Sequence, residues 1–465
     1  FVGYNAGKGD ATNGITGYNN VAIGQAAGQS LAGGNHNTLL GAGAGADVSS
    51  GAENVLIGRD TGREVTTGTK HIAIGTEALH KRTTGNGMIA IGYRSFYSAT
   101  DNGSGIAIGY QACRDLTTGY WNTAVGNHAL ESVLTNSHNT AFGQEALQSC
   151  QGSFNDGVGW HAGKRITTGS ANCIFGQGAG QNITSSINNT ALGNNALQQC
   201  STGSRNTAVG RVTLANTNGT QNTAVGFEAM ASSTDNGGHS YNTAVGSQAL
   251  KAITTGVNNV SLGWQSLHTL TTGFQNVAIG VQALENSNGY HQGAIGDNAL
   301  SASASGIGWI GIGHDCAKSL TAGSHNVFMG NEAGTSATNV TDVVMIGHSA
   351  GKLATTADKS TIVGSHALNN LTTGNKNVGV GWGTLSATTS NYENTAVGSL
   401  AGNACTGHYN TFIGCDAGDN ATSGDNNIVI GANADLTAAT SSGHIVLGTT
   451  SNSDLRCNDD SISAL

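Results

Sequence analysis

One pattern of apolar and polar residues recurs along the whole chain, and a clear copy is the stretch NTAVGNHAL, residues Asn122–Leu130. Each copy has an apolar residue directly before a glycine, and most copies have a Thr, Val or Ile two positions earlier. Alternate residues of a strand point to the same face, so these two positions share a face. We therefore predict a short strand that ends before Gly126 and its equivalents, with Val125 and its equivalents in the core.

The spacing of this marker glycine is regular. The steps from Gly109 to Gly126 and from Gly126 to Gly143 are each 17 residues, and 20 of the 26 intervals between Gly3 and Gly448 have this same length. Such a period, sustained over 27 copies, predicts one stacked array in place of several globular domains. The six other intervals are longer or shorter. We expect these length differences to lie in turns, where added or missing residues leave the stacking intact.

The position between the two apolar columns is usually Ala, as at Ala124. A strand with one solvated face would be polar there, so both faces are predicted to be buried. We expect the Ala face to pack against another copy of the same chain. This is the sequence argument for an oligomer.

Asn122 and its equivalents open most copies and are expected to form stacked amide ladders or to cap the turn into the strand. Ala129 and Leu130 follow the glycine and predict a second, inward-facing strand. A polar turn, commonly Thr-Thr-Gly, comes next, and its glycine is expected to supply a positive φ.

Two short strands and two turns within one repeat are typical of a single coil of a parallel β-solenoid, whereas a helical repeat needs a longer unit and less glycine. The predicted fold is all-β, with about 27 coils in a repetitive shaft over residues 1–450. Residues 451–465 form a separate segment.

Composition narrows the function. The chain has 72 Gly, no Pro and 10% charged residues, which excludes collagen and is unlike ordinary disordered tracts. Net charge is −9 and the 18 basic residues are scattered, so no nucleic-acid partner is predicted. No apolar run is long enough to span a bilayer, so membrane insertion is not expected.

Candidate chemistry is sparse. The 15 His are spread over turns and positions after the marker glycine, and no H-x-H pair occurs. Turn residues such as His239 are expected to be solvated. The eight Cys form no CxxC motif and are interpreted as small buried fillers. No carboxylate pair stands out in the sequence, although residues from distant coils can converge. We therefore predict no metal, no cofactor and no catalytic residue in the shaft.

Aromatic residues are few and gather between residues 93 and 121. Exposed aromatic rings on a polar rod are a common means of gripping sugars by stacking. Packing against neighbouring coils or subunits is the alternative. The candidate glycan contacts are Tyr93, Tyr97, Tyr110, Tyr120 and Trp121.

The stretches NNVAIG, ending at Gly24, and NVAIG, ending at Gly280, resemble the repeats of trimeric autotransporter adhesin heads. That family forms left-handed parallel β-rolls assembled as homotrimers. The resemblance covers nearly the whole chain, although the period is longer than the repeats typical of those heads. Left-handedness and three-fold symmetry are what the resemblance implies.

After the last coil, the stretch SNSDLRCNDDSI resembles the start of the endosialidase-type intramolecular chaperone that follows phage tail fibres and tailspikes. That family opens with Ser-Asp-x-Arg-x-Lys and cuts itself between the Ser and the Asp. The resemblance places this junction at Ser453 and Asp454, and Arg456 matches as well. Asn458 occupies the lysine position, which weakens the expectation of self-cleavage.

The sequence thus predicts a structural and adhesive fibre, extracellular or on a virion surface, that attaches to a host glycan or protein receptor. Its predicted partner is itself, as a homotrimer. The alternatives are a bacterial trimeric adhesin, an ice-binding solenoid suggested by the Thr columns, and a polysaccharide-degrading tailspike.

Overall fold

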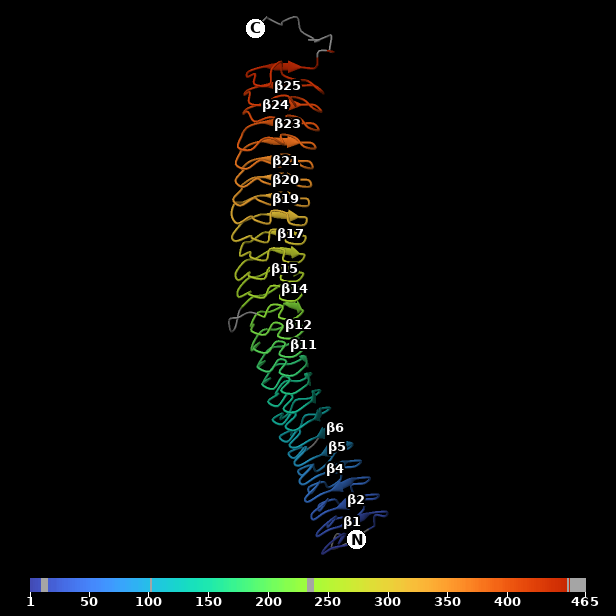
Figure 1. Cartoon of the computed structure of the whole chain (residues 1–465). Helices are drawn as coiled ribbons and strands as arrows, with labels where there is room; N and C mark the ends of the chain where they lie inside the picture. The colour runs from blue at the N-terminus through green and yellow to red at the C-terminus, as the bar shows by residue number, and fades with distance from the viewer. Residues whose placement is uncertain (10–15, 101–102, 232–237, 450, 452–465) are drawn as a thin grey trace, which may run out of the picture. The chain divides into compact units, whose positions relative to one another are not determined.

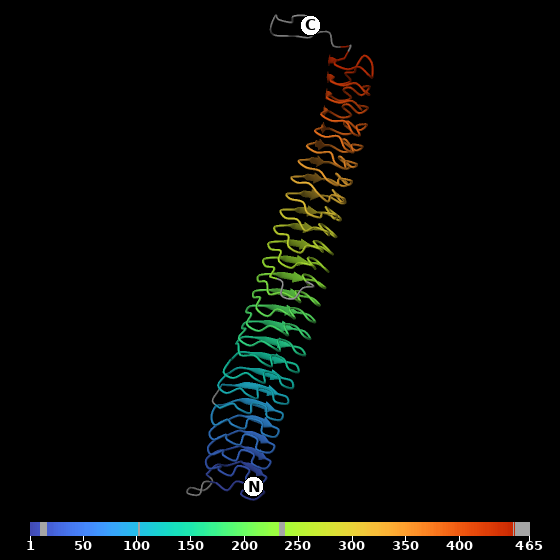
Figure 2. The ribbon, with the colours of Figure 1, turned by 90° about the vertical axis from the view of Figure 1, so that its left-hand side faces the viewer.

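The computed structural model describes residues 1–9, 16–100, 103–231, 238–449 and 451, and divides into two compact units, Phe1–Asn242 and Thr243–Leu465. Each unit is a stack of coils that carry one short strand apiece, and the strands pair side by side in a parallel sheet (Figures 1 and 2). The described residues contain no helix. The predicted all-β parallel solenoid is confirmed.

In the first unit, thirteen strands have been assigned to the described residues. They are β1 (Val21–Ile23), β2 (Thr38–Leu40), β3 (Val55–Ile57), β4 (Ile72–Ile74), β5 (Met88–Ile91), β6 (Gly105–Ile108), β7 (Thr123–Val125), β8 (Thr140–Phe142), β9 (Asp156–Val158), β10 (Cys173–Phe175), β11 (Thr190–Leu192), β12 (Thr207–Val209) and β13 (Thr223–Val225).

The described part of the second unit likewise has thirteen. They are β14 (Thr243–Val245), β15 (Val260–Leu262), β16 (Val277–Ile279), β17 (Gly293–Ile295), β18 (Ile310–Ile312), β19 (Val327–Met329), β20 (Val344–Ile346), β21 (Thr361–Val363), β22 (Val378–Val380), β23 (Thr395–Val397), β24 (Thr411–Ile413), β25 (Ile428–Ile430) and β26 (Ile445–Leu447).

Coils of different length keep the same register. Thr123 of β7 pairs with Thr140 of β8, and Thr140 pairs with Asp156 of β9, although the second of these coils is one residue shorter than the first. The β16–β17 and β23–β24 pairs also span a coil of the shorter length. The prediction that length differences are absorbed in turns is confirmed for these coils.

The marker glycine is required by backbone stacking as well as by its conformation. Gly126 has φ of +139°, and a Cβ added there would lie 2.3 Å from the carbonyl oxygen of Gly143 in the next coil. The same close approach recurs between marker glycines in both units. A side chain at this column would separate adjacent coils.

The two faces of the strand are the reverse of those predicted. The middle residue, Ala124 in β7, is fully buried inside the coil, whereas Val125 is half-buried and points outward. In β1, Ala22 is fully buried and the flanking Val21 and Ile23 are 49% and 41% exposed. The Ala column therefore fills the coil interior, and it is the larger apolar residues that face away from it.

This reversal follows from the narrow interior, where two opposing columns must fit together. Ala124 in the strand and Ala129 and Leu130 in the turn after the marker glycine are all fully buried. In several coils with a large strand residue the opposite column is glycine: a Cβ on Gly334 would lie 2.5 Å from the ring of Phe328. Each layer thus holds roughly one large side chain.

The predicted second strand is absent from the described coils. Ala129 and Leu130 lie in a run of turns instead, and the second and fourth residues after the marker glycine have positive φ, +57° at His128 and +48° at Leu130. Left-handed residues at alternate positions curl the backbone and prevent an extended strand.

The glycine of the Thr-Thr-Gly turn has a role different from the one predicted. Gly119 and Gly374 have no positive φ; instead, a Cβ would lie 2.1 Å and 1.9 Å from the carbonyl oxygens of Asn136 and Asn391 in the next coil. Beside this turn, threonine hydroxyls form a ladder. Thr66 donates to the carbonyl of Thr83 at 2.7 Å, and the pattern continues through Thr83, Thr100 and Thr117.

The predicted asparagine ladder is confirmed. Asn139 donates its backbone N–H and its side-chain amide to Oδ1 of Asn122, at 3.0 and 3.2 Å, and Asn122 donates to the carbonyl of Asn136 at 2.8 Å. Both amides are buried. Where Asn is replaced, the substitute can keep the bond across coils: the buried indole of Trp309 donates to the carbonyl of Gly323 at 3.2 Å.

His71 takes the place of an asparagine in this ladder. Its backbone N–H donates to Oδ1 of Asn54 at 3.0 Å, and its Nδ1 accepts the N–H of Met88 at 3.2 Å. The side chain is fully buried next to the buried Arg82. Burial, and then the charge of Arg82, lower the pKa of His71 to about 4.

The marker glycine gives a direct test of the stacking. Gly280→Ala places a methyl group 2.3 Å from the carbonyl oxygen of Gly296 at a φ of +135°. We expect the free energy of unfolding, measured by chemical denaturation, to fall by more than about 3 kcal/mol. Gly293→Ala is the matched control, because its Cβ meets nothing within 4 Å and its φ is ordinary. Equal losses in both variants would contradict this account.

The lowered pKa of His71 predicts a dependence of stability on pH. Between pH 6.5 and 4 the unfolded chain binds a proton that the folded chain excludes, so stability falls as pH falls. The difference in the free energy of unfolding between pH 7.5 and pH 4 should be about 3 kcal/mol larger in the wild type than in His71→Asn. The variant restores the ladder residue and shares every other titrating group, so equal pH profiles would refute the assignment.

Candidate functional site

The turn after the marker glycine builds a second exposed side of each coil, which we call the polar wall. It consists of the first, second, fifth and sixth residues after each marker glycine. It carries ion pairs in coils of both units: Arg94 lies 2.6 Å from Glu77 in the first, and Lys352 lies 2.8 Å from Glu332 in the second. This side is chemically distinct from the outward strand face, where Val, Ile, Leu and Thr predominate.

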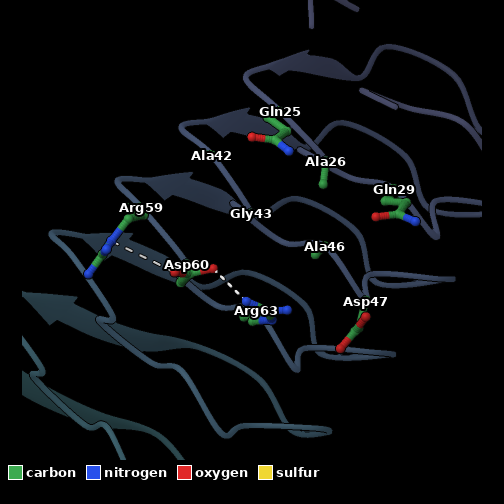
Figure 3. A pocket seen from close by; sticks show the side chains of 10 residues that line it. All are labelled: Gln25, Ala26, Gln29, Ala42, Gly43, Ala46, Asp47, Arg59, Asp60 and Arg63. Carbon is green, nitrogen blue, oxygen red and sulfur yellow. Dashed lines mark hydrogen bonds and ion pairs between the residues drawn. The ribbon is translucent and has the colours of Figure 1, made fainter. Parts of the chain in front are cut away.

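A notch interrupts the polar wall of the first unit (Figure 3). Its volume is about 290 Å³, and it opens where one coil has the small residues Ala42, Gly43 and Ala46 on this side, with Asp47 next to them. The coils on either side carry longer residues at the same positions. The lining residues are Gln25, Ala26, Gln29, Ala42, Gly43, Ala46, Asp47, Arg59, Asp60 and Arg63.

Two arginines of the notch hold the Asp60 carboxylate in place. Arg63 donates to the Asp60 carboxylate at 2.8 Å, and Arg59 lies 3.8 Å from the same group (Figure 3). Gly43 makes room for this carboxylate, since a Cβ there would lie 2.4 Å from Oδ1 of Asp60. The small coil therefore provides both the hollow and the space for Asp60 to lean over it.

Three of the five predicted glycan contacts come together on the polar wall. The rings of Tyr93 and Tyr110 stack with their centroids 5.3 Å apart, and the Arg94 guanidinium lies 5.1 Å from the Tyr93 ring and 5.2 Å from the Tyr97 ring. Arg94 is held by Glu77, whose carboxylate lies 2.6 Å from Nε. This hydrogen bond raises the pKa of Arg94.

The other two predicted contacts lie on a different edge, in the turn before the strand. Tyr120 and Trp121 pack edge to face, with ring centroids 5.1 Å apart, and His138 contacts both. Phe154 stacks on His138 at 4.8 Å. The structure thus divides the predicted patch into two clusters.

The sequence reading missed that aromatic residues return to this same turn in other coils. In the second unit, the rings of Phe274 and Tyr290 stack with their centroids 5.0 Å apart, and the ring centroids of Tyr392 and His408 lie 4.2 Å apart. The signal available in the sequence was their shared place one or two residues before the ladder position. Tyr392 also lines a second hollow of about 290 Å³ with Thr373, Asn375, Lys376, Ser390 and Glu393.

Histidine and cysteine differ in part from their predicted placements. His239 is buried, not solvated, and its backbone carbonyl accepts a hydrogen bond from the ladder amide of Asn222 at 2.9 Å. Cys150 and Cys200 are buried as predicted, and burial raises the pKa of both thiols to about 11. Cys415 is exposed, contrary to the filler interpretation, because it follows its marker glycine on the polar wall.

Among the described residues, no group of three or more His, Cys, Asp or Glu side chains is placed to hold a metal ion. One pair of carboxylates does converge: the pKa of Asp435 is raised by partial burial and then by the charge of Asp419. Asp435 is exposed and accepts the N–H of Asn420 at 3.3 Å. The junction residues Ser453, Asp454 and Arg456 lie outside the described residues.

The described part of the chain has no helix long and apolar enough to cross a membrane. No protein-family model matches the sequence, and no curated protein matches it. Function therefore has to be argued from the two sides of the coil.

Proposed function

We propose that the protein is the structural shaft of an adhesive fibre, extracellular or on a virion surface, in which copies of the chain associate through the outward strand faces. The polar walls are left for attachment to a host surface. The observation that carries this proposal is the predominantly apolar character of the outward face in each unit, where large exposed Val, Ile, Leu and Phe side chains recur from strand to strand.

The outward face consists of the first and third residues of each three-residue strand and their equivalents in β5 and β6. Within the described strands its only charged member is Asp156. Exposure is high for large side chains, including 56% at Phe142, 49% at Leu192 and 44% at Ile295. A contiguous exposed apolar surface of this kind often marks a protein–protein interface.

The size of this face supports an interface. Thirteen strands spaced about 4.8 Å apart give each unit a strip about 60 Å long, and the two outward positions lie about 7 Å apart along the strand. A projected area on the order of 400 Å² per unit equals the largest apolar patches of typical monomers, which are often functional.

A second copy of the chain is the partner that fits best. Its outward residues repeat at the same strand spacing, so apolar side chains can interdigitate coil after coil without a change of register. An unrelated globular partner would match only a few coils. The number of copies expected is three, from the resemblance to trimeric adhesin heads.

The alternatives receive less support. An ice-binding face needs an uninterrupted threonine array, and in the first unit the outward threonines are broken at Asp156 and Cys173. A tailspike enzyme needs an enclosed carboxylate pair, whereas Asp435 is exposed.

The assembly is tested by the solution mass, measured by light scattering. We expect three times 46.6 kDa for the wild type. The double variant Leu262→Asp, Ile279→Asp places two charges on the outward face and should dissociate to a single chain, because each charge would be buried without a partner.

The matched control is Gln265→Asp, Gln282→Asp, which adds the same charges to the polar wall of the same two coils. It should keep the wild-type mass. A wild type with the mass of one chain, or loss of assembly in both double variants, would refute association through the strand face.

A further inference from the structure

The polar wall stays accessible when the outward faces are covered, since the two are built by different segments of each coil. The inference below rests on the proposed attachment function and names the ligand class and its site. It concerns the first unit, where the notch is lined by the coils after Gly24, Gly41 and Gly58, and the tyrosine cluster begins two coils further along the same wall, after Gly92.

The notch is a recess with hydrogen-bonding groups on opposite rims. Gln25 and Gln29 stand on one rim and Arg59 and Arg63 on the other (Figure 3). Its floor is the small coil around Ala46, with no large side chain to fill it. Amide, carboxylate and guanidinium groups around one recess offer both hydrogen-bond donors and acceptors, as a polyhydroxylated ring requires.

The charges of the notch favour a neutral ligand. Two guanidinium groups, of Arg59 and Arg63, face two carboxylates, of Asp47 and Asp60, so the formal charge is zero. The Arg63 side chain is already paired with Asp60 at 2.8 Å. An anionic ligand would have to displace this carboxylate from its partner.

The notch connects to the tyrosines through a chain of ion pairs. Arg59 lies 3.6 Å from Glu77, and Glu77 holds Arg94, which packs against Tyr93 and Tyr97. Tyr110 extends the stacked rings by one coil and is 45% exposed. A polar recess on the same wall as fixed aromatic rings is an arrangement suited to an oligosaccharide, whose sugar rings have apolar faces and hydroxyls at their edges.

We propose that this part of the polar wall binds a neutral hexose oligosaccharide, with one pyranose ring in the notch and further rings against Tyr93 and Tyr110. The small residues Ala42, Gly43 and Ala46 create the subsite, and Gln29, Asp47 and Asp60 supply hydrogen bonds to hydroxyl groups. Repetition of the site in each copy of an assembled fibre strengthens attachment through multivalency.

Ala46→Gln tests the subsite, because it fills the hollow while keeping every polar lining group. Glutamine is compatible with this column, since Gln29 occupies the equivalent position in the preceding coil. Lys318→Gln, at the same column in the second unit and outside the notch, is the matched control. Tyr110→Ser removes a stacking ring and tests the second part of the site.

The probes are immobilised di- to tetrasaccharides of glucose, mannose and galactose, with uronic-acid and sialic-acid oligomers of matched length. We expect the wild type to bind a neutral member, with affinity at least tenfold lower in Ala46→Gln, several-fold lower in Tyr110→Ser and unchanged in Lys318→Gln. Binding to acidic members alone, equal affinity in wild type and Ala46→Gln, or no binding to any probe would overturn the proposal.

Light scattering on the same samples separates this inference from the fibre proposal. If Ala46→Gln keeps a three-chain mass but loses the glycan binding of the wild type, the notch is identified as the binding site. A wild type of single-chain mass that still binds through the notch would refute the assembly and leave the site standing. An assembled wild type that binds no probe would refute the site and leave the fibre.

Discussion

Each coil must stack in register on another coil one strand spacing away, and this constraint decides what every column of the repeat can contain. A residue's nearest neighbours across the stack are residues of its own column. Glycine is needed where backbones nearly touch, as at Gly126 and Gly143. Asparagine suits the buried turn because one amide can donate to the next coil while its oxygen accepts from it, as Asn122 and Asn139 show.

The same constraint separates the two sides of the coil. Ion pairs and amide pairs between adjacent coils are compatible with stacking on the polar wall, because opposite charges can alternate from layer to layer. The outward strand face instead repeats apolar groups, which gain nothing from water and can be covered only by another surface. The fold therefore presents one side suited to assembly and another suited to solvent and ligands.

The period, the parallel stacking and the asparagine ladder could be predicted from the sequence because each depends on a repeated residue type. The faces of the strand were predicted in reverse, since pattern analysis assigns the larger apolar residue to the core. The interior is too narrow for that assignment: the small Ala124 of the strand is fully buried in the same coil as Leu130, and the larger Val125 points outward. The missing second strand and the backbone contact at Gly119 likewise depend on three-dimensional curvature that residue spacing does not reveal.

The candidate site was predictable only in part. Tyrosine is visible in a sequence, so Tyr93 and Tyr110 were found, but their separation from Trp121 required the turns to be placed in space. The notch is a different case. It arises from what Ala42 and Ala46 lack, and small residues in a glycine- and alanine-rich repeat give no signal until the longer side chains around them are seen.

Coils that differ in length by one residue keep the same pairing, and each coil contacts its immediate neighbours through the same few bonds. A whole repeat can therefore be gained or lost by recombination between similar stretches of the gene, and the remaining coils need not readjust. Each such event would change the reach of the solenoid by about 4.8 Å. Length becomes a trait that can evolve in small steps, separately from the residues that determine assembly and binding.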